Sequence, residues 1–298
     1  MHKPVLLKEV IATLDPQTGK IFVDCTVNRG GHAVAIAKRL DKRGVLVGID
    51  ADANALAEAR RNLQNIGPSV KLIHGNFRHL TKILAELKLK KIDGTLFDLG
   101  LSSDQLDGSG RGFTFQKDEP LVMSFDTNPI DLPFTAGDIL NEWTEEHLAD
   151  ILYGYGEERY SRQIAKAIVL ARQKHPIETT GGLVAIIRGA VPITYTHRRL
   201  HFSTKTFQAL RMAVNDELGA LKEGLNAAWE HLNTGGRLGV ISFHSLEARV
   251  VKEFFKAKKK DGAGEWLTNK VIKPSREEML ANPRSRSAQL RAIKKITN

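Results

Sequence analysis

The stretch that decides the fold is residues 21–50, IFVDCTVNRGGHAVAIAKRLDKRGVLVGID. It begins with a short apolar run rich in β-branched residues, Ile21 to Val27, which two consecutive glycines interrupt. Ala33 to Leu40 has the apolar spacing of a helix, and Val45 to Ile49 is a second apolar run of strand length. The stretch therefore predicts a strand, a glycine turn, a helix and a parallel strand, which form the first βαβ unit of an open, mostly parallel α/β sheet.

The polar residues of this stretch predict a nucleoside ligand. In open α/β sheets, ligands bind beyond the carboxyl ends of the strands, where the turn with Gly30 and Gly31 meets the end of the second strand. Asp50 lies there, twenty residues after Gly30, where a carboxylate accepts hydrogen bonds from two ribose hydroxyls. The turn NRGGH (28–32) lacks the G-x-G-x-x-G spacing of a dinucleotide site. This difference favours S-adenosylmethionine over NAD; a tight turn without a ligand is the alternative.

The composition is that of a soluble globular protein, with 42% hydrophobic and 26% charged residues among 298. No apolar run reaches the length of a membrane span and the first residues lack the layout of a signal peptide, so we expect a cytoplasmic protein without membrane contact. The single cysteine, Cys25, excludes an internal disulfide, and its apolar surroundings indicate a core residue.

The positive charge is concentrated at one end of the chain. Of the net charge of +10, +8 falls in residues 251–298. Such a basic segment predicts a polyanionic partner, and nucleic acid is the one we expect; a solvated cationic tail is the alternative.

Two further groups of polar or aromatic residues follow predicted strands. Phe77 comes soon after the third strand, at Val70 to His74, where it is interpreted either as a ring stacked on an adenine or as a core anchor. Asp98, near the end of the fourth strand, is followed by Ser102 and Ser103. A carboxylate and two hydroxyls placed there can contact both a cofactor and an acceptor, although two serines are also common in turns.

The βα alternation then stops for about a hundred residues, far more than an ordinary connection. Ala136 to Tyr153 and Arg159 to Lys174 have helical spacing, and no strong strand is present. We predict an inserted helical substrate-recognition domain at 104–201, within a cofactor-binding domain formed by 1–103 and 202–298.

The remaining elements are less distinctive. Thr204 to Leu232 is predicted as one long helix, and Val271 to Lys273 and Ser287 to Ile296 as the last two strands. His197 and His201 have the spacing of metal ligands, but no third ligand is evident, so we predict no metal site.

One histidine lies at the end of a fifth predicted strand, at Arg237 to Ser242. Ser245, followed by Glu247, predicts a helix N-cap at this point. His244 then either meets the substrate or anchors the turn, and the sequence leaves both interpretations open.

Eight blocks, in order, resemble the RsmH (MraW) family of bacterial methyltransferases: HKPVLLKEV, GGHA, DLGLSSDQLD, RGFTF, YGEERYSRQIAKAIVLAR, TKTFQALRMAVNDEL, GGRLGVISFHSLEARVVK and NPRSRSAQLRA. This family uses S-adenosylmethionine to methylate the N4 amine of one cytidine in the decoding region of 16S ribosomal RNA. The resemblance implies a Rossmann-like class I methyltransferase sheet with an all-helical insert, S-adenosylmethionine as cofactor, and small-subunit ribosomal RNA within the 30S particle as partner. The oligomeric state is not decided, and a homodimer is one possible form.

The resemblance also assigns residues. Cofactor contacts are implied at Gly30, Gly31, His32, Asp50, Phe77, Asp98 and Gln105. The family usually has glycine where Asn28 stands, and it reads close to FSFR and PLDMRMD where this chain has FTFQ (113–116) and PLVMSFD (120–126). Val122 and Ser124 therefore replace an acid and an arginine. Because these two changes lie in the insert, they bear on RNA contacts more than on binding of the methyl donor.

The chemistry of the acceptor gives a mechanistic hypothesis. A cytosine N4 amine is a poor nucleophile because its lone pair is delocalised into the ring. We expect Asp98 and the backbone carbonyls of 99–101 to accept the amine protons, with Ser102 or Ser103 orienting the base. Asp98 serving only the cofactor is the alternative. Stacking and phosphate contacts with the RNA are predicted for Arg111, Phe113, Phe115, Arg284 and Arg286.

Three other functions compete with this one. A methyltransferase could act on a protein amine or a small molecule instead, which an RNA-independent activity would reveal. A non-catalytic ribosome-assembly factor could bind S-adenosylmethionine and RNA without turnover. A dehydrogenase is the least favoured, because the glycine spacing does not fit a dinucleotide.

Overall fold

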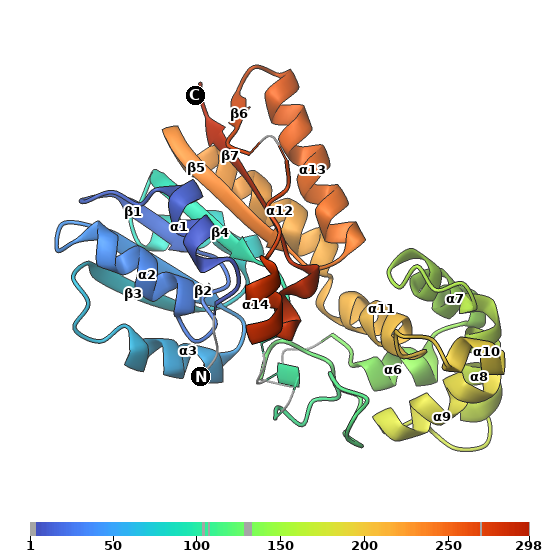
Figure 1. The fold of residues 1–298 in the computed structure, drawn as a ribbon. Helices are drawn as coiled ribbons and strands as arrows, with labels where there is room; N and C mark the ends of the chain where they lie inside the picture. The colour runs from blue at the N-terminus through green and yellow to red at the C-terminus, as the bar shows by residue number, and fades with distance from the viewer. Residues whose placement is uncertain (1–3, 103–104, 107, 128–132, 269, 298) are drawn as a thin grey trace. The chain divides into compact units, whose positions relative to one another are not determined.

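The structure is a computed structural model that describes residues 4–102, 105–106, 108–127, 133–268 and 270–297. The chain forms two compact units, drawn in Figure 1. The first unit comprises residues 1–100 and 218–298, and the second comprises residues 101–217.

A seven-stranded sheet in the order β3-β2-β1-β4-β5-β7-β6 forms the centre of the first unit. Neighbouring strands from β3 to β5 are parallel, whereas β7 runs antiparallel to both β5 and β6. The predicted α/β fold with a mostly parallel sheet is thereby confirmed. The strand order reverses direction between β1 and β4, which is the place where open α/β sheets bind ligands. The strands are β1 (Ile21–Asp24), β2 (Val45–Asp50), β3 (Ser69–His74), β4 (Ile92–Asp98), β5 (Leu232–Ser242), β6 (Gly264–Trp266) and β7 (Gln289–Lys295).

Helices cover both faces of this sheet because successive strand residues point to opposite sides. Phe22 packs with α1, α2 and α3 on one face, and its neighbour Val23 packs with α4, α12 and α13 on the other. Leu96 and Phe97 of β4 divide in the same way. The helical segments are α1 (Leu7–Leu14), α2 (Gly31–Leu40), α3 (Ala53–Asn62), η1 (Phe77–His79), α4 (Leu80–Glu86), α12 (Glu217–His231), α13 (Ser245–Lys260), α14 (Arg276–Ala281) and η3 (Pro283–Ser287).

The first residues of the chain pack against its last part within the first unit. The backbone N–H of Leu6 donates to Oε1 of Glu278 in α14 at 2.7 Å. Farther along, Nη1 of Arg237 in β5 donates to the carbonyl of Thr13 at 2.8 Å. The N-terminal segment is therefore fixed by residues more than two hundred positions away.

The second unit is helical in its described part and has its own apolar core. Residues such as Ile139, Leu148, Ile164, Leu183 and Leu210 meet in this core. The unit takes in α11, whereas the predicted insert ends at residue 201. Its helices are α6 (Ala136–Glu142), α7 (Glu145–Gly154), α8 (Ser161–Arg172), α9 (Thr180–Ala190), α10 (Ile193–Thr196) and α11 (Thr204–Asn215). In the part of the chain that is described, no helix is both long and apolar enough to cross a membrane.

Two helices predicted as continuous are each broken in the structure. The predicted helix 204–232 ends at Asp216, whose backbone is left-handed at φ 42° and ψ 49°, so α11 and α12 are separate. The predicted helix 136–153 is interrupted at Trp143, whose extended backbone precedes the Thr144 cap of α7. In both cases the apolar spacing continues across a break that the backbone imposes.

One predicted strand is also wrong. Residues 271–273 form no ladder, and only Ile272 makes an isolated bridge, to Leu290 of β7. The strand that pairs with the outer side of β7 is β6, which comes earlier in the chain and is three residues long. Too few residues belong to β6 for its sequence to show an alternating pattern.

Candidate functional site

Three aspartates end neighbouring parallel strands of the first unit. Asp24, Asp50 and Asp98 are the last residues of β1, β2 and β4. Because these strands run in the same direction, the three carboxyls share one edge of the sheet, next to its switch point. Asp24 was not predicted from the sequence. Its signal is an acid closing the apolar run IFVD directly before the glycine turn.

Asp50 closes the glycine turn. Its Oδ2 accepts the backbone N–H of Asn28 at 2.7 Å, and its Oδ1 accepts the N–H of Asp52 at 2.9 Å. Burial raises the pKa of Asp50 to about 6, although both hydrogen bonds act in the opposite direction. A carboxylate oxygen has two lone pairs, so each oxygen keeps one for a further donor. Asp50 can therefore hold the turn and bind ribose hydroxyls together.

The turn itself needs residues that tolerate a left-handed backbone. Asn28 has φ 49°, and its Oδ1 accepts the N–H of Arg29 at 2.9 Å. Gly30 has φ 85° and stands at the N-cap of α2. Asparagine and glycine are the residues that most readily adopt such a backbone, which explains why Asn28 can stand where the resembled family has glycine. A Cβ on Gly31 would lie 3.1 Å from the side chain of Pro4, so Gly31 makes room for the N-terminal segment.

His32 connects that segment to Asp98. Its ring is buried, with Nε2 2.8 Å from the carbonyl of Val5 and Nδ1 3.4 Å from Oδ2 of Asp98. Burial lowers the pKa of His32, which favours the neutral ring. We assign the proton to Nε2, because the Val5 carbonyl can only accept a hydrogen bond. Nδ1 is then an acceptor facing Asp98.

Asp98 has unused hydrogen-bonding capacity. Burial, followed by the negative charge of Glu247, raises the pKa of Asp98 to about 7. Its buried Oδ1 has no hydrogen-bond partner among the described residues. A buried acceptor without a partner is costly, so this oxygen fits a donor supplied by a ligand.

Asp24 adds a third carboxyl at this edge of the sheet. It is only 1% exposed, and burial raises its pKa to about 7, with the nearby charges of Asp98 and Asp50 acting in the same direction. Thr26 joins two of these acids, since its N–H donates to Asp24 at 3.2 Å and its hydroxyl accepts the N–H of Asp98 at 2.7 Å. Three desolvated carboxyls at one edge favour a ligand that carries positive charge.

Phe77 packs against the edge of the apolar core of the first unit. Its half-buried ring meets Phe97 edge to face, with 5.3 Å between the ring centroids. Gly224 of α12 leaves the space for this ring, because a Cβ there would lie 2.7 Å from it. These contacts agree with the interpretation of Phe77 as a core anchor, and stacking on an adenine stays a prediction.

Ser102 and Gln105 belong to the second unit, where they hold each other. Oε1 of Gln105 accepts the N–H of Ser102 at 2.9 Å, and the N–H of Gln105 donates to Oγ of Ser102 at 3.1 Å. This reciprocal arrangement is that of a capping box. Both side chains are buried. Ser103 lies outside the described residues.

Two of the residues predicted to bind RNA have structural roles in the second unit. Nη1 of Arg111 donates to the carbonyls of Ser124 and Phe125, at 3.1 and 2.9 Å. Phe113 is only 6% exposed and stacks on Phe125, so it offers no open face to a base, and its predicted stacking does not fit the structure. Phe115 is half-buried, with its ring stacked on that of His201 at 4.3 Å. Arg284 and Arg286 are exposed in η3 of the first unit.

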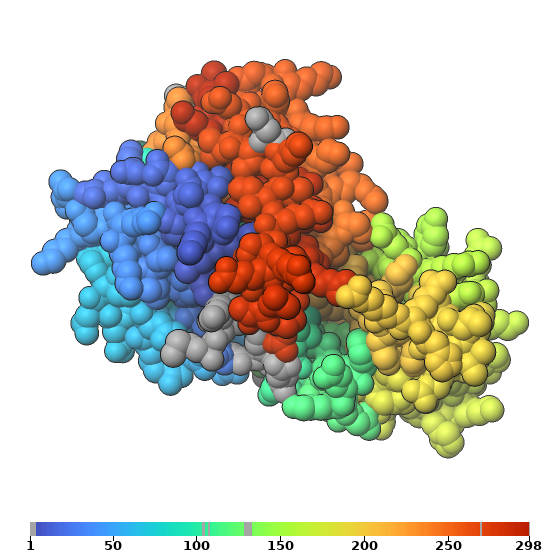
Figure 2. All heavy atoms as spheres, viewed as in Figure 1, coloured from blue at the N-terminus to red at the C-terminus, as the bar shows by residue number. Residues whose placement is uncertain are grey.

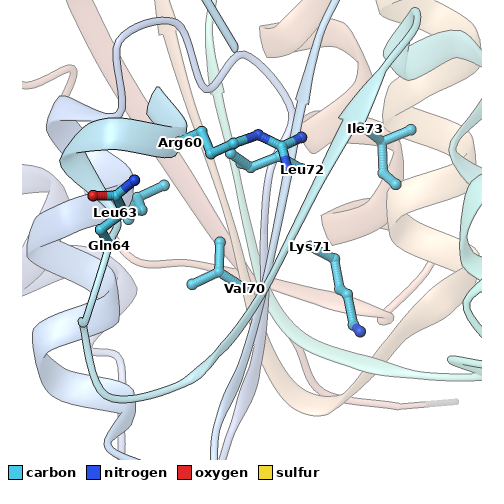
Figure 3. A pocket seen from close by; sticks show the side chains of 7 residues that line it. All are labelled: Arg60, Leu63, Gln64, Val70, Lys71, Leu72 and Ile73. Carbon is cyan, nitrogen blue, oxygen red and sulfur yellow. The ribbon is translucent and has the colours of Figure 1, made fainter. Parts of the chain in front are cut away.

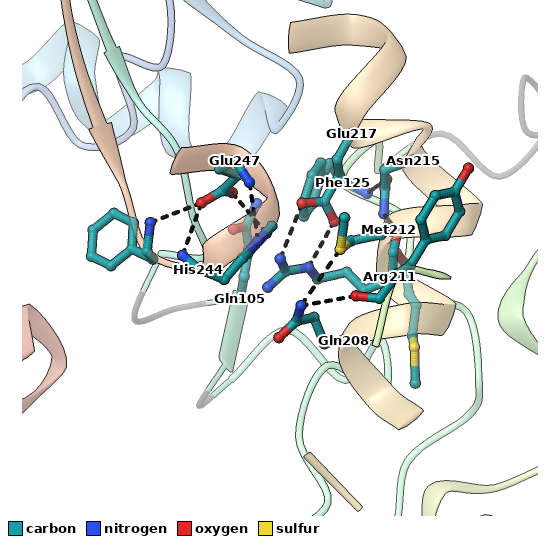
Figure 4. A network of polar contacts seen from close by, with 12 residues as sticks. Gln105, Phe125, Gln208, Arg211, Met212, Asn215, Glu217, His244 and Glu247 are labelled. Atoms are coloured by element: carbon teal, nitrogen blue, oxygen red, sulfur yellow. Dashed lines mark hydrogen bonds and ion pairs between the residues drawn. The ribbon is translucent and has the colours of Figure 1, made fainter. Parts of the chain in front are cut away.

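The segment that carries Val122 and Ser124 is held by α11. Nδ2 of Asn215 donates to the carbonyl of Met123, and its Oδ1 accepts the N–H of Phe125, both at 2.8 Å. Ser124 is itself buried, and its hydroxyl accepts a backbone N–H of the same turn. Figure 4 shows the contacts of Asn215 together with the bidentate ion pair between Arg211 and Glu217, whose N–O distances are 2.7 and 3.0 Å.

His244 is the N-cap of α13, in place of the predicted Ser245. Its Nδ1 accepts the N–H of Glu247 at 3.4 Å, and Oε2 of Glu247 accepts the N–H of His244 at 3.2 Å (Figure 4). Histidine is an uncommon cap, which is why the sequence pattern favoured the serine. The structure thus gives His244 a role in anchoring the turn.

Two further features are a pair of histidines in the second unit and a cavity in the first unit. Within the described part of the chain, His197 and His201 belong to no group of three metal-ligating side chains. A cavity of about 340 Å³ lies between α3 and the edge strand β3 (Figure 3). It is lined by Arg60, Leu63, Gln64, Val70, Lys71, Leu72 and Ile73, none of which was predicted as a site residue.

Comparison with known proteins gives consistent matches over nearly the whole chain. Residues 1–296 match the MraW methylase family. Ribosomal RNA small subunit methyltransferase H of Syntrophotalea carbinolica is 46% identical, over 99% of this chain and 98% of that protein. The protein of the same name in Heliobacterium modesticaldum is 48% identical with the same coverage. Among solved structures, an rRNA methylase from Streptococcus thermophilus matches with a TM-score of 0.48 and 10% identity, covering 100% of this chain and 99% of that one.

Proposed function

This chain belongs to the MraW methylase family, and from that premise we propose that it methylates small-subunit ribosomal RNA. The predicted methyl donor, S-adenosylmethionine, is confirmed by this membership. The proposed acceptor is the N4 amine of a cytidine in the decoding region, reached within 30S particles in the cytoplasm. The observation that carries the proposal is the group of three carboxyls, one buried and two half-buried, beside the glycine turn, at the edge where this fold binds ligands.

The residues of the first unit fit the methyl donor. Asp50 keeps acceptor capacity on both oxygens for ribose hydroxyls. Asp24 is buried, Asp98 is half-buried, and their charges interact, so the donor's ammonium and sulfonium charges would favour their ionised forms. S-adenosylmethionine supplies an activated methyl group, so the protein needs no nucleophile of its own.

The acceptor needs help that Asp98 can give. As the amine attacks a methyl group, its nitrogen becomes positive and its protons more acidic, so a carboxylate that accepts one of them stabilises the transition state. Asp98 has an unpartnered Oδ1, and Nδ1 of His32 lies 3.4 Å from the other oxygen of the same carboxyl. The backbone carbonyls of 99–101 are further acceptors in this proposal, and Ser102 or Ser103 would orient the base.

The test is transfer of labelled methyl from S-adenosylmethionine to 30S subunits that lack the modification, followed by nucleoside mass spectrometry. We expect label in N4-methylcytidine. Asp98→Asn should reduce the rate about 100-fold or more while donor binding weakens far less, since an amide cannot take the proton. Asp41→Ala, an exposed acid in a loop of the first unit, is the matched control.

Other outcomes would contradict parts of this proposal. Label in another nucleoside would refute the N4 assignment while leaving RNA methylation intact. Label in protein or a small molecule would refute RNA as the acceptor. Saturable donor binding without any product would favour the assembly factor instead.

A further inference from the structure

One continuous stretch of the second unit contains basic residues but no acidic ones. Residues 179–215 contain five Lys and Arg residues and two His, but no Asp or Glu. They form α9, α10, α11 and the connections between them. Arg211 is paired with Glu217, and the other four cations of this stretch have no acid within the stretch itself, which favours a positive potential there.

Residues 197–200, in the middle of this stretch, are exposed to solvent. His197, Arg198 and Arg199 are exposed, and the apolar residues on either side, Ile193 and Leu200, are 74% and 55% exposed. In Figure 2 the yellow part of the chain, near residue 200, lies open on the face in view. Arginines beside exposed apolar side chains are typical of a binding surface rather than of a solvated one.

Three arginines here lie over aromatic rings. The guanidinium carbon of Arg198 is 4.9 Å from the ring centroid of Tyr195, and that of Arg159 is 5.6 Å from Tyr160. The two tyrosine rings meet edge to face at 4.9 Å, so these pairs are neighbours. Arg188 lies over Phe202 at 5.5 Å.

A buried carboxylate fixes the two tyrosines. Glu158 is 0% exposed, and its Oε2 accepts the hydroxyl of Tyr195 at 2.8 Å. Its Oε1 accepts the backbone N–H of Tyr160 at 2.9 Å. Both oxygens are thus used to orient the aromatic surface. A guanidinium resting on such a ring is held flat, with little conformational freedom left to lose on binding.

We propose that this arginine–tyrosine surface, formed by Arg159, Tyr160, Arg188, Tyr195, Arg198 and Arg199, binds a single-stranded segment of the substrate RNA. A guanidinium plane that rests on an aromatic ring can stack on an unpaired base with its other face. The same group binds phosphates through paired N–H donors. The inference rests on the proposed function, because it names RNA contacts other than the buried Phe113 and the half-buried Arg111, whose guanidinium donates to backbone carbonyls. It also gives the HRR sequence at 197–199 a role without a metal.

The test compares binding of a small-subunit rRNA fragment to three variants at several salt concentrations. Arg198→Ala/Arg199→Ala should weaken binding at least tenfold and reduce the slope of log affinity against log salt by about two. Arg198→Lys/Arg199→Lys should keep the slope but stay weaker than the wild type, since lysine carries the charge without the planar stack. Arg39→Ala/Arg43→Ala, two exposed arginines of the first unit, should change little.

Each result is decisive. Equal loss in the Arg39/Arg43 control, or wild-type affinity in the Arg198/Arg199 variants, overturns the proposal. Unchanged affinity for the naked fragment with weaker binding to whole 30S subunits also overturns it, and points to a ribosomal protein as the partner. If the wild type binds RNA with this arginine dependence but transfers no methyl, the surface stands and the proposed activity fails. Affinity for S-adenosylmethionine, measured by calorimetry, should be the same in every variant.

Discussion

At the scale of single residues, Asp50 shows how one side chain can serve both the fold and the ligand. Its carboxylate accepts the backbone N–H of Asn28 in the glycine turn and that of Asp52 after β2, and each oxygen keeps a free lone pair. A change at this position should therefore alter the shape of the turn as well as the proposed contact with the ribose.

We predict that Asp50→Ala weakens binding of S-adenosylmethionine about 100-fold, because the hydroxyl acceptors and the turn are lost together. Asp50→Asn keeps one acceptor oxygen and should lose less. Calorimetric titration with the donor measures both. Asp41→Ala should bind as the wild type, and an Asp50→Ala protein with wild-type affinity would remove the residue from the site.

The three carboxyls at the strand ends predict opposite pH dependences for stability and for binding. Burial raises the pKa values of Asp24 and Asp98 to about 7 and that of Asp50 to about 6, all above the usual 3.8. The folded protein therefore holds protons that the unfolded chain releases, and its stability without ligand should fall as the pH rises from about 4 to about 7. A cationic ligand prefers the ionised acids, so donor affinity should rise between pH 6 and 7.5. Thermal unfolding at pH 5 to 8, with and without S-adenosylmethionine, tests both directions; a ligand-induced shift that is larger at pH 5 would contradict them.

Asn28 predicts a substitution that the protein should tolerate. Its φ of 49° suits glycine, so Asn28→Gly should change the free energy of unfolding little. Asn28→Ala should cost about 1 kcal/mol, because a Cβ without a compensating side-chain hydrogen bond is strained there. Urea unfolding of both variants measures the difference, and equal stabilities would show that the backbone relaxes.

Individual residues were predictable where chain spacing alone defines them. Gly30 and Asp50 follow from the spacing of a βαβ unit, and Asp98 from its place at a strand end. Burial is not visible in that spacing, which is why Phe113 was taken for an RNA contact although it lies in the core of the second unit. Asp24 was missed for a similar reason, because an acid at the end of an apolar run gives no periodic signal.

At the scale of elements, short caps and breaks decide where the helices begin and end. The sequence indicated most strands of the parallel sheet, since each is a compact apolar run between turn residues. It did not show the break at Asp216, because the apolar stripe continues from α11 into α12. Periodicity reports which side chains are apolar, whereas the break depends on the backbone angles of one residue.

The cap of α13 gives a prediction for an element. His244→Ala removes the side chain that accepts the N–H of Glu247, so it should lower the free energy of unfolding by about 1 kcal/mol. His244→Asn should restore most of this loss, since asparagine is a favoured N-cap. Chemical unfolding measures the change, with His175→Ala at an exposed position as control. A fully stable His244→Ala protein that loses activity would instead favour contact with the substrate.

At the scale of the whole molecule, the net charge of +10 predicts that the proposed RNA binding depends on salt. The sequence located most of this charge in residues 251–298 but could not show the arginine–tyrosine surface, whose parts are brought together only by the fold. Each unit therefore carries a basic region of its own.

We predict that Arg286→Ala, which removes an exposed charge in η3, weakens RNA binding about equally for different sequences and reduces the salt slope by about one. Fluorescence anisotropy with two unrelated RNA fragments across a salt series measures both effects. Arg43→Ala serves as the control. A salt slope identical to that of the wild type would exclude Arg286 from phosphate contact.

The junction between the start and the end of the first unit has a consequence for biosynthesis. His32 is positioned by the carbonyl of Val5, and the next residue, Leu6, is held by Glu278. During translation the glycine turn emerges early, but the hydrogen bond from Leu6 to Glu278 forms only after α14 has left the ribosomal tunnel. A nascent chain that has not yet reached α14 should therefore hold His32 and the glycine turn less firmly than the folded protein does.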